Sequence, residues 1–261
     1  MNIWFTLLYQ PLVNALILFY QVLGGNLALA IIGMTLVLRA AMIPLTAPSL
    51  KTAQKMKELA PELEKLKAQY KHDKTEFAKA QLALYQKHGA NPAAGCLPQI
   101  IQIVILIALF QAFSQVLRSN GDTIAKLNEI LYPFLKLAEG HIINFKFLYL
   151  DLTKPDMISL PFKIGLDKLV IDKIPGIFLL GSAGAQFVSS KMMMPMVKKE
   201  EKIARKTPEK TDDMVTAMQE QMLYLMPVMT LIIGFTFPSG LVLYWLTFSV
   251  FMLVQQSMIK K

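Results

Sequence analysis

A single arginine, Arg39, stands in an otherwise apolar stretch, residues 27–46, that is long enough to cross a bilayer. A guanidinium near the centre of such a helix costs about 2.5–3.5 kcal/mol on insertion scales, so it is retained only where water or a partner reaches it. The predicted spans contain no Asp or Glu that would neutralise it. Arg39 is therefore the first candidate for chemistry in this chain.

Other polar side chains are expected near Arg39. Thr35 and Thr46 share its helix face, within roughly 40° of one another at 100° per residue. Gln102 and Gln186 each lie ~8 Å from the cytoplasmic end of their own predicted spans. Arg39 lies up to ~18 Å deep if its helix runs unbroken to the first lysine. These groups fall between the cytoplasmic surface and the midplane of the membrane.

Two interpretations of this polar set stay open. Arg39 can be a structural residue that backbone carbonyls and the two glutamines satisfy. Alternatively, it can line a water-filled pocket that opens to the cytoplasm and receives an anionic guest. We adopt the pocket as the hypothesis, because no acidic residue within the predicted spans pairs with the arginine.

Signatures of catalysis are missing from the sequence. It has no P-loop, no Rossmann glycine run and no His-Glu-x-x-His, and its three histidines are isolated outside the predicted spans. The methionine-rich run 192–196 is expected to be a flexible apolar contact surface, not a metal site. The single cysteine, Cys96, excludes an internal disulfide. We therefore expect no enzymatic activity, no cofactor and no bound metal.

Composition indicates an integral membrane protein. Apolar residues make up 54% of the 261 positions and charged residues 17%, and the apolar residues are concentrated in long uncharged runs. The longest run, Gln221–Ile259, would form a helix of about 58 Å, roughly twice the hydrocarbon thickness. Pro238 and Gly240 divide it into two antiparallel spans. We predict an all-α protein with five transmembrane helices.

Two further helical segments lie outside these spans. Residues 3–23 are apolar enough to cross a membrane, but Thr6, Gln10, Asn14 and Gln21 form one polar stripe, which favours a helix lying in the outer interface over a sixth span. Residues 49–90 read as a cytoplasmic helical hairpin, because apolar residues step by three and four from Met56 to Tyr70. Pro61 is expected to kink its first helix.

The net charge of +9 is concentrated in the hairpin and at the C-terminus. Cytoplasmic loops of membrane proteins carry this bias and face anionic lipid headgroups, so the charge does not indicate DNA binding. Placing the lysine-rich segments in the cytoplasm puts the N-terminus outside and the C-terminus inside. The sequence then divides into the following parts: an interfacial helix (1–25), transmembrane helix 1 (26–48), the hairpin (49–92), transmembrane helix 2 (93–118), an external loop (119–173), transmembrane helix 3 (174–191), a cytoplasmic loop (192–220), and transmembrane helices 4 (221–237) and 5 (239–259).

Four motifs occur in an order that resembles the YidC-type membrane protein insertases. They are Thr35-Leu-Val-Leu-Arg39-Ala-Ala-Met-Ile-Pro44-Leu-Thr46, Asn91-Pro-Ala-Ala-Gly95-Cys96-Leu-Pro98-Gln-Ile-Ile-Gln102, Phe147-Leu-Tyr-Leu-Asp151-Leu, and Met226-Pro227 followed by Phe237-Pro238-Ser239-Gly240-Leu-Val-Leu-Tyr244-Trp245. A lysine-rich hairpin separates the first two. The resemblance covers nearly the whole chain.

This resemblance implies a five-helix core with a hydrophilic groove that is open to cytoplasm and lipid and closed to the outside. Arg39, Gln102 and Gln186 match groove residues of the family, and Tyr244 and Trp245 match aromatic positions that contact the substrate. The implied partners are nascent membrane proteins, the ribosome and the Sec translocon. The implied location is the bacterial plasma membrane. Because no long basic tail follows Lys261, we expect reduced ribosome contact.

A second function class remains as an alternative. A small-anion transporter or channel could use Arg39 to bind its substrate. Inverted repeats and paired broken helices would favour that class, and the sequence shows no such internal symmetry.

Overall fold

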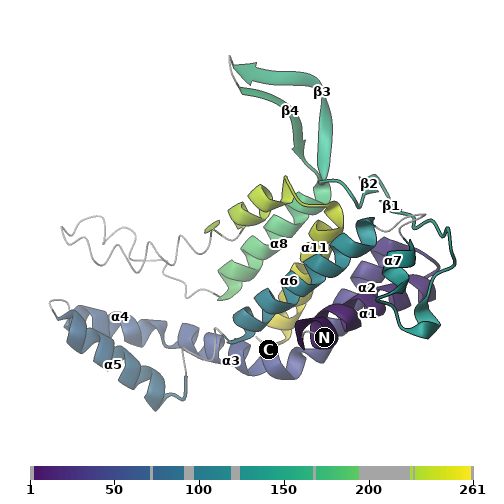
Figure 1. Ribbon diagram of the computed structural model, residues 1–261. Coiled ribbons are helices and arrows are strands. Elements are labelled where there is room, and N and C mark those ends of the chain that lie inside the picture. Colours follow the sequence, from purple (N-terminus) through teal and green to yellow (C-terminus); the bar gives the residue numbers. More distant parts are fainter. Residues whose placement is uncertain are drawn as a thin grey trace.

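The computed structural model of the protein describes residues 3–70, 73–90, 97–118, 124–166, 169–193, 224–225 and 227–259. Most of the predicted cytoplasmic loop 192–220 lies outside these residues, as do His72 at the predicted hairpin tip, Cys96 and the terminal lysines. Helices dominate the described part of the chain (Figure 1). The prediction of a helical membrane protein is thus confirmed.

The N-terminal segment is a π-helical turn, Phe5–Tyr9, followed by α1, Gln10–Val22. Three of the four residues of its polar stripe, Gln10, Asn14 and Gln21, bind protein backbone, whereas Thr6 is exposed. The Gln10 amide donates to the carbonyl oxygen of Ile130, and the Gln21 amide donates to the carbonyl oxygen of Leu135. Asn14, only 2% exposed, donates to Ile130 and accepts from the Tyr132 amide. The stripe therefore binds the backbone of residues 130–135.

The predicted first span is not one straight helix. Helix α2 covers Leu27–Ala41 and α3 covers Ile43–Glu58, and the two are bent by 68° at the break. Pro44 is in the first turn of α3, where a proline is tolerated because the amide there has no partner within the helix. Within a continuous helix the same proline would clash with the carbonyl of Ala40 and remove a hydrogen bond. The chain bends here instead.

Helices α4, Ala60–Gln69, and α5, Lys74–Lys87, follow α3 and contact each other. Pro61 lies in the first turn of α4, so the helix breaks where the sequence predicted a kink. Asp73 caps α5, since its carboxylate accepts from the Glu76 amide at 3.0 Å. A separate small apolar cluster joins these helices, formed by Met56, Leu59, Leu63, Tyr85 and Ala90.

The remaining long helices are α6, Leu97–Arg118, α8, Ile177–Met193, and α11, Ser239–Ile259. Residues 227–234 are also helical, and the chain turns at 235–238 before α11 begins. Helix α8 packs along α11 and, through Leu179, against Gly234. At Gly234 an added Cβ would collide with the Leu179 side chain, so glycine permits this close approach.

The prediction of an all-α fold is wrong for residues 146–175. Strands β1, Lys146–Phe147, and β2, Leu150–Asp151, pair antiparallel, and so do β3, Met157–Leu166, and β4, Leu169–Pro175. In β3 the apolar residues alternate strictly, with Ile158, Leu160, Phe162, Ile164 and Leu166 at every second position. That period of two is typical of a strand and was present in the sequence.

This loop region is tied to the N-termini of two helices. Asp156 is 1% exposed and accepts from the Leu179 amide in the first turn of α8 at 2.8 Å, and from the Tyr149 hydroxyl at 2.8 Å. The Ser239 amide, at the start of α11, donates to the carbonyl of Lys154 at 2.7 Å. Residues 149–156 thus satisfy amides that the first turns of α8 and α11 leave without partners in their own helices.

Three described helices are long and apolar enough to cross a membrane, namely Phe5–Val22, Ile101–Arg118 and Ser239–Met258. The bent pair α2 and α3 makes a fourth if it is counted as one span. Figure 1 shows β3 and β4 projecting from one end of these helices, and α4 and α5 lying beyond the other end. The chain is therefore a multi-pass helical membrane protein, and its two helix and strand hairpins lie at opposite ends of the apolar helices.

Candidate functional site

Arg39 lies near the end of α2, two residues before the helix ends at Ala41. Its side chain is 6% exposed, and its guanidinium carbon lies 3.4 Å from the centre of the Phe248 ring on α11. Among the described residues, Nη2 of Arg39 has no hydrogen-bond partner. The depth of ~18 Å predicted for an unbroken helix does not apply, because the helix bends at Met42.

The contact with Phe248 compensates only part of the cost of burying Arg39. A desolvated cation–π contact stabilises by about 2 kcal/mol or more. A buried donor without a partner costs about 1–3 kcal/mol, and more when it is charged. The ring offers the guanidinium no hydrogen-bond acceptor. A carboxylate would supply both an opposite charge and acceptor oxygens in bidentate geometry. The site is therefore chemically suited to an anionic group.

The Gln102 and Tyr244 side chains are brought together from α6 and α11. The Gln102 amide donates to the Tyr244 hydroxyl at 2.7 Å, and Tyr244 is 3% exposed. Tyr244 lies one helical turn from Phe248, so Gln102 and Arg39 contact the same face of α11. Gln102 therefore contacts Tyr244 directly, whereas Arg39 reaches the same helix face one turn away, through Phe248.

After the Arg39–Phe248 and Gln102–Tyr244 contacts, a third contact lies further along the same face of α11. The Gln255 amide donates to the Thr46 hydroxyl on α3 at 3.1 Å, and both side chains are buried. Positions 244, 248 and 255 differ by four and seven residues, which places them on one face of the helix. We call Tyr244, Phe248 and Gln255 the polar-contact face of α11.

Thr35 is close to Arg39 in sequence, but its side chain hydrogen-bonds to the backbone of its own helix. Its hydroxyl donates to the Ile31 carbonyl at 2.6 Å, and the residue is 1% exposed. A threonine that bonds the preceding turn in this way needs no other donor or acceptor, and such bonds often bend helices slightly. In this conformation Thr35 therefore presents no free hydroxyl hydrogen to Arg39.

Gln186 makes its described contact away from the polar-contact face of α11. It accepts from the Thr230 hydroxyl at 2.5 Å, which joins α8 to helix 227–234. One turn further along α8, Ser189 accepts from the Gln256 amide of α11 at 2.8 Å. Trp245 is partly buried and packs against the apolar core. The sequence-predicted residues thus divide between the polar-contact face and a separate set of contacts around α8.

Sequence reasoning missed Phe248 and Gln255 as partners of the first span. A signal for Gln255 was present, because two adjacent glutamines in an otherwise apolar span require polar partners. Phe248 carried no such signal, since a phenylalanine in a membrane helix is ordinary. Thr46 was recognised as sharing a face with Arg39, but it was not assigned to the site.

Metal chemistry finds no support in the described ranges, where no group of three His, Cys, Asp or Glu side chains could hold an ion. Asp151, outside the apolar helices, has a role in local structure. The Thr153 hydroxyl and the Lys154 ammonium hold the pKa of the Asp151 carboxyl below its ordinary value. What the site offers is a buried cation with amide and hydroxyl groups along one helix face.

Residues 18–261 match a protein family described as the 60Kd inner membrane protein. The chain belongs to this family. The family resemblance inferred from the four sequence motifs is therefore confirmed, and the 60Kd inner membrane protein description agrees with the multi-pass helical fold.

Curated relatives in this family carry insertase names. The "Membrane protein insertase YidC" of Pelobacter propionicus is 33% identical over 265 residues, which cover 99% of this chain and 39% of the relative. "Membrane protein insertase YidC 1" of Halalkalibacterium halodurans is 31% identical, covering 97% of this chain and 77% of the relative. The YidC of Fusobacterium nucleatum is 31% identical, covering 91% and 87%. The chain therefore spans about two fifths of the length of the first relative and most of the other two.

Proposed function

We propose that this chain is a membrane protein insertase. It receives nascent membrane proteins in a hydrophilic groove open to the cytoplasm and to lipid, and it releases their helices into the bilayer. The observation that carries the proposal is the buried guanidinium of Arg39, whose Nη2 has no hydrogen-bond partner in the described part of the chain. Membership of a family whose curated members are named insertases supports it.

The physical obstacle to insertion is the polar segment of the client that must cross the membrane. Each unsatisfied polar group costs several kcal/mol in hydrocarbon. A wet groove that reaches part of the way across shortens the dry path. Arg39 serves as a temporary counter-charge to acidic residues in that segment, exchanging its contact with Phe248 for a carboxylate. Burial of the client's apolar helix in lipid then drives the step.

The polar-contact face of α11 supports this role. Gln102 with Tyr244 and Thr46 with Gln255 lie on both sides of Arg39 along the helix. These amides and hydroxyls can exchange their mutual hydrogen bonds for bonds to a client's backbone at little net cost. Gln186 and Trp245 line the same groove in the proposal, which implies that α8 moves or that the client reaches it from another side. No catalytic chemistry is needed.

We further propose five spans in this chain, formed by α2 with the start of α3, α6, α8, residues 221–237 and α11. In this proposal the N-terminus lies outside and the C-terminus lies in the cytoplasm. Helices α4 and α5 form a cytoplasmic hairpin, and residues 119–173 lie outside. The location of α4–α5 and β3–β4 at opposite ends of the helices supports this arrangement. The ribosome, the Sec translocon and anionic lipids are the proposed partners on the cytoplasmic side.

The segment containing α1 is proposed to lie in the outer interface and not to form a sixth span. The Trp4 indole donates to Gln111, seven residues or about 10 Å before the Arg118 end of α6. The other end of α1 leads into the start of α2, next to the loop residues that bind its polar stripe. Both ends of α1 are therefore in the outer half of the bundle, which supports an oblique interfacial helix.

Reconstitution tests the function. The purified chain is placed in liposomes, and a small single-span client with an acidic external segment is synthesised in their presence. We expect the protease-protected fraction to exceed that in protein-free liposomes several-fold. Chloride and nitrate flux measured in the same vesicles should equal the protein-free rate. Protection no greater than in protein-free liposomes, or an Arg39-dependent anion flux, would overturn the proposal in favour of another function class.

A further inference from the structure

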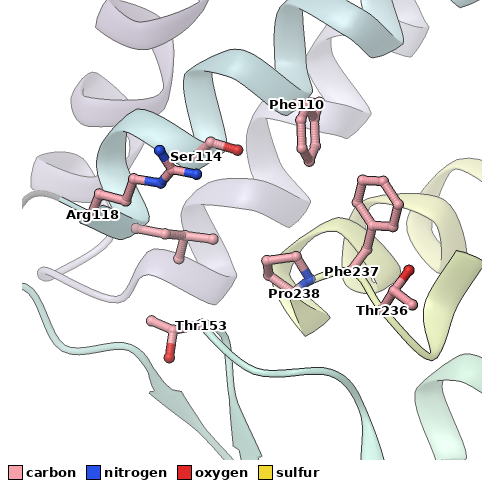
Figure 2. Close-up of a pocket in the computed structure, with 8 residues that line it drawn as sticks. Phe110, Ser114, Arg118, Thr153, Thr236, Phe237 and Pro238 are labelled. Atoms are coloured by element: carbon pink, nitrogen blue, oxygen red, sulfur yellow. The ribbon is translucent and has the colours of Figure 1, made fainter.

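A cavity of about 540 Å³ lies at the end of α6 that is far from the α4–α5 hairpin. Its lining combines one cation, three hydroxyls and four apolar side chains: Arg118, Ser114, Thr153, Thr236, Phe110, Leu117, Phe237 and Pro238. Figure 2 shows Arg118, Ser114 and Phe110 on α6 along one side, Thr236, Phe237 and Pro238 across from them, and Thr153 on the loop below. None of these residues belongs to the Arg39 site.

The cavity lies at the end of a candidate membrane span, and therefore at one of the two interfaces of the bilayer. Ile101–Arg118 is long and apolar enough to span, and Arg118 is its last residue. Thr153 belongs to the loop that is tied to the start of α11, while Phe110 contacts Phe237 edge to face with ring centres 5.1 Å apart. The lining therefore changes from apolar to polar over one cavity, as the bilayer does at its interface.

The polar atoms divide the cavity into two chemically distinct sides. Arg118 supplies a permanent cation beside the Ser114 hydroxyl on α6. Opposite them, the Thr236 hydroxyl donates to the Ile233 carbonyl at 2.9 Å, and the Thr153 hydroxyl donates to the Asp151 carboxylate at 2.6 Å. Each threonine has thereby used its only hydrogen, so its oxygen can only accept from a ligand. The negative charge of Asp151 is itself paired with Lys154 at 2.9 Å.

A continuous apolar path leads from this cavity toward the membrane centre. Ile103, Ile107 and Phe110 are spaced by four and three residues on one face of α6, and they are 49%, 47% and 36% exposed. Ser114 and Arg118 continue the same face in steps of four. A hydrocarbon chain lying along this face would end with its polar head in the cavity.

We infer that this cavity binds the headgroup of an anionic glycerophospholipid whose headgroup carries hydroxyls, the chemistry of phosphatidylglycerol. The phosphodiester faces Arg118 and Ser114, since an arginine fork matches phosphate oxygens. The headgroup hydroxyls donate to the oxygens of Thr153 and Thr236. One acyl chain lies along Ile103 and Ile107. This inference does not depend on the insertase function.

Lipid binding to the purified, delipidated chain in detergent micelles tests the inference, with native mass spectrometry counting bound lipids. We expect one phosphatidylglycerol to bind in preference to phosphatidylcholine. Arg118→Gln should lower its affinity about five-fold, the effect of one basic side chain near a lipid headgroup. Arg118→Lys should retain most of the affinity. Lys126→Gln, which removes the same charge from α7 (Ile124–Asn128) outside the cavity, should bind like the wild type.

A second variant tests the orientation of the headgroup. Thr236→Val removes an acceptor, so it should weaken phosphatidylglycerol but not phosphatidic acid, which has no headgroup hydroxyls to donate. Soluble glycerophosphoglycerol should not compete, because it lacks the acyl chain. Wild-type affinity in Arg118→Gln, an equal loss in Lys126→Gln, or competition by the soluble headgroup would each overturn the proposed lipid site.

Discussion

At the scale of single residues, the described partner of the Arg39 guanidinium is the Phe248 ring. The stacked Phe248 shields the cation without hydrogen-bonding to it. The guanidinium is buried, and its Nη2 has no hydrogen-bond partner among the described residues. Under the proposed function, this donor would be available to a client carboxylate.

Replacing Arg39 tests the counter-charge role. Arg39→Ala should reduce insertion of a client with an acidic external segment roughly ten-fold more than insertion of a neutral one, because a hydrogen bond to a charged group contributes about 1.5 kcal/mol. Arg39→Lys should keep much of the activity, since it retains the cation but loses the planar fork. Protease protection of two clients that differ in one external residue measures this. Equal impairment of both clients, at normal protein levels, would refute the role.

The cation–π contact makes a separate prediction about stability. Phe248→Leu should lower the free energy of unfolding by about 2 kcal/mol, through loss of ring packing and of the contact with Arg39. In an Arg39→Ala background the same change should cost about 1–2 kcal/mol less. The free energy of unfolding is measured for the wild type, the two single variants and the double variant in mixed micelles of increasing dodecyl sulfate content. Phe248→Tyr is the control that keeps the aromatic face. Strict additivity would show that the ring does not stabilise the cation.

At the scale of elements, residues 149–156 of the external loop hold the starts of two helices, a role that the sequence motif at residues 147–152 did not predict. Asp156 binds the first turn of α8, and the backbone of residues 152–154 binds the first turn of α11. An anionic carboxylate at a helix N-terminus is also favoured by the helix dipole. The starts of α8 and α11 are thereby held by the same loop segment.

Gly176 makes this anchoring testable. An added Cβ at Gly176 would collide with the Asp156 carboxylate, whereas at Gly184, also on the α8 segment, it would meet nothing within 4 Å. Gly176→Ala should therefore lower the free energy of unfolding by about 1–3 kcal/mol. Gly184→Ala should leave it unchanged or raise it by about 0.5–1 kcal/mol, because alanine favours helix. Thermal unfolding of the two variants gives the comparison. Similar stability of both would exclude Asp156 as a rigid anchor.

At the scale of the whole molecule, the distribution of charge predicts an orientation in the membrane. The hairpin segment 51–91 carries nine lysines and five acidic residues, whereas the 119–173 region is nearly neutral. The positive-inside rule then assigns the two ends of the bundle to opposite sides of the membrane.

Cysteine labelling tests that orientation. After replacement of Cys96, single cysteines at positions within 55–88, 198–212 and 260–261 should react with an impermeant thiol reagent only from the cytoplasmic side. Cysteines within 120–172 should react fully from the outside. A cysteine at position 107, where the isoleucine of α6 is 47% exposed and is expected to face lipid, should stay protected from both sides and serve as the control. Cytoplasmic reactivity of the 120–172 loop would reject the five-span arrangement.

Much of this molecule can be predicted from patterns along the chain. Hydropathy runs longer than a bilayer indicate membrane helices, and a lone arginine among them predicts a candidate site. The four motifs suffice to predict the family. The strand alternation in residues 158–166 was equally local, and attention to its period of two would have predicted the β3–β4 hairpin.

These patterns could not predict the contacts between segments that are distant in sequence. The polar stripe of α1 has the same periodicity whether it faces headgroups or the backbone of residues 130–135, and only the fold distinguishes the two. From the sequence alone, Phe248 is an ordinary lipid-facing residue. Its contact with Arg39 depends on the packing of α11 against α2. Pro44 gives a local reason for the break at Met42, but the sequence does not give its angle of 68°. Periodicity reports which side chains share a face, but the partner of that face is fixed by packing between helices far apart in sequence, and that packing has no local signal.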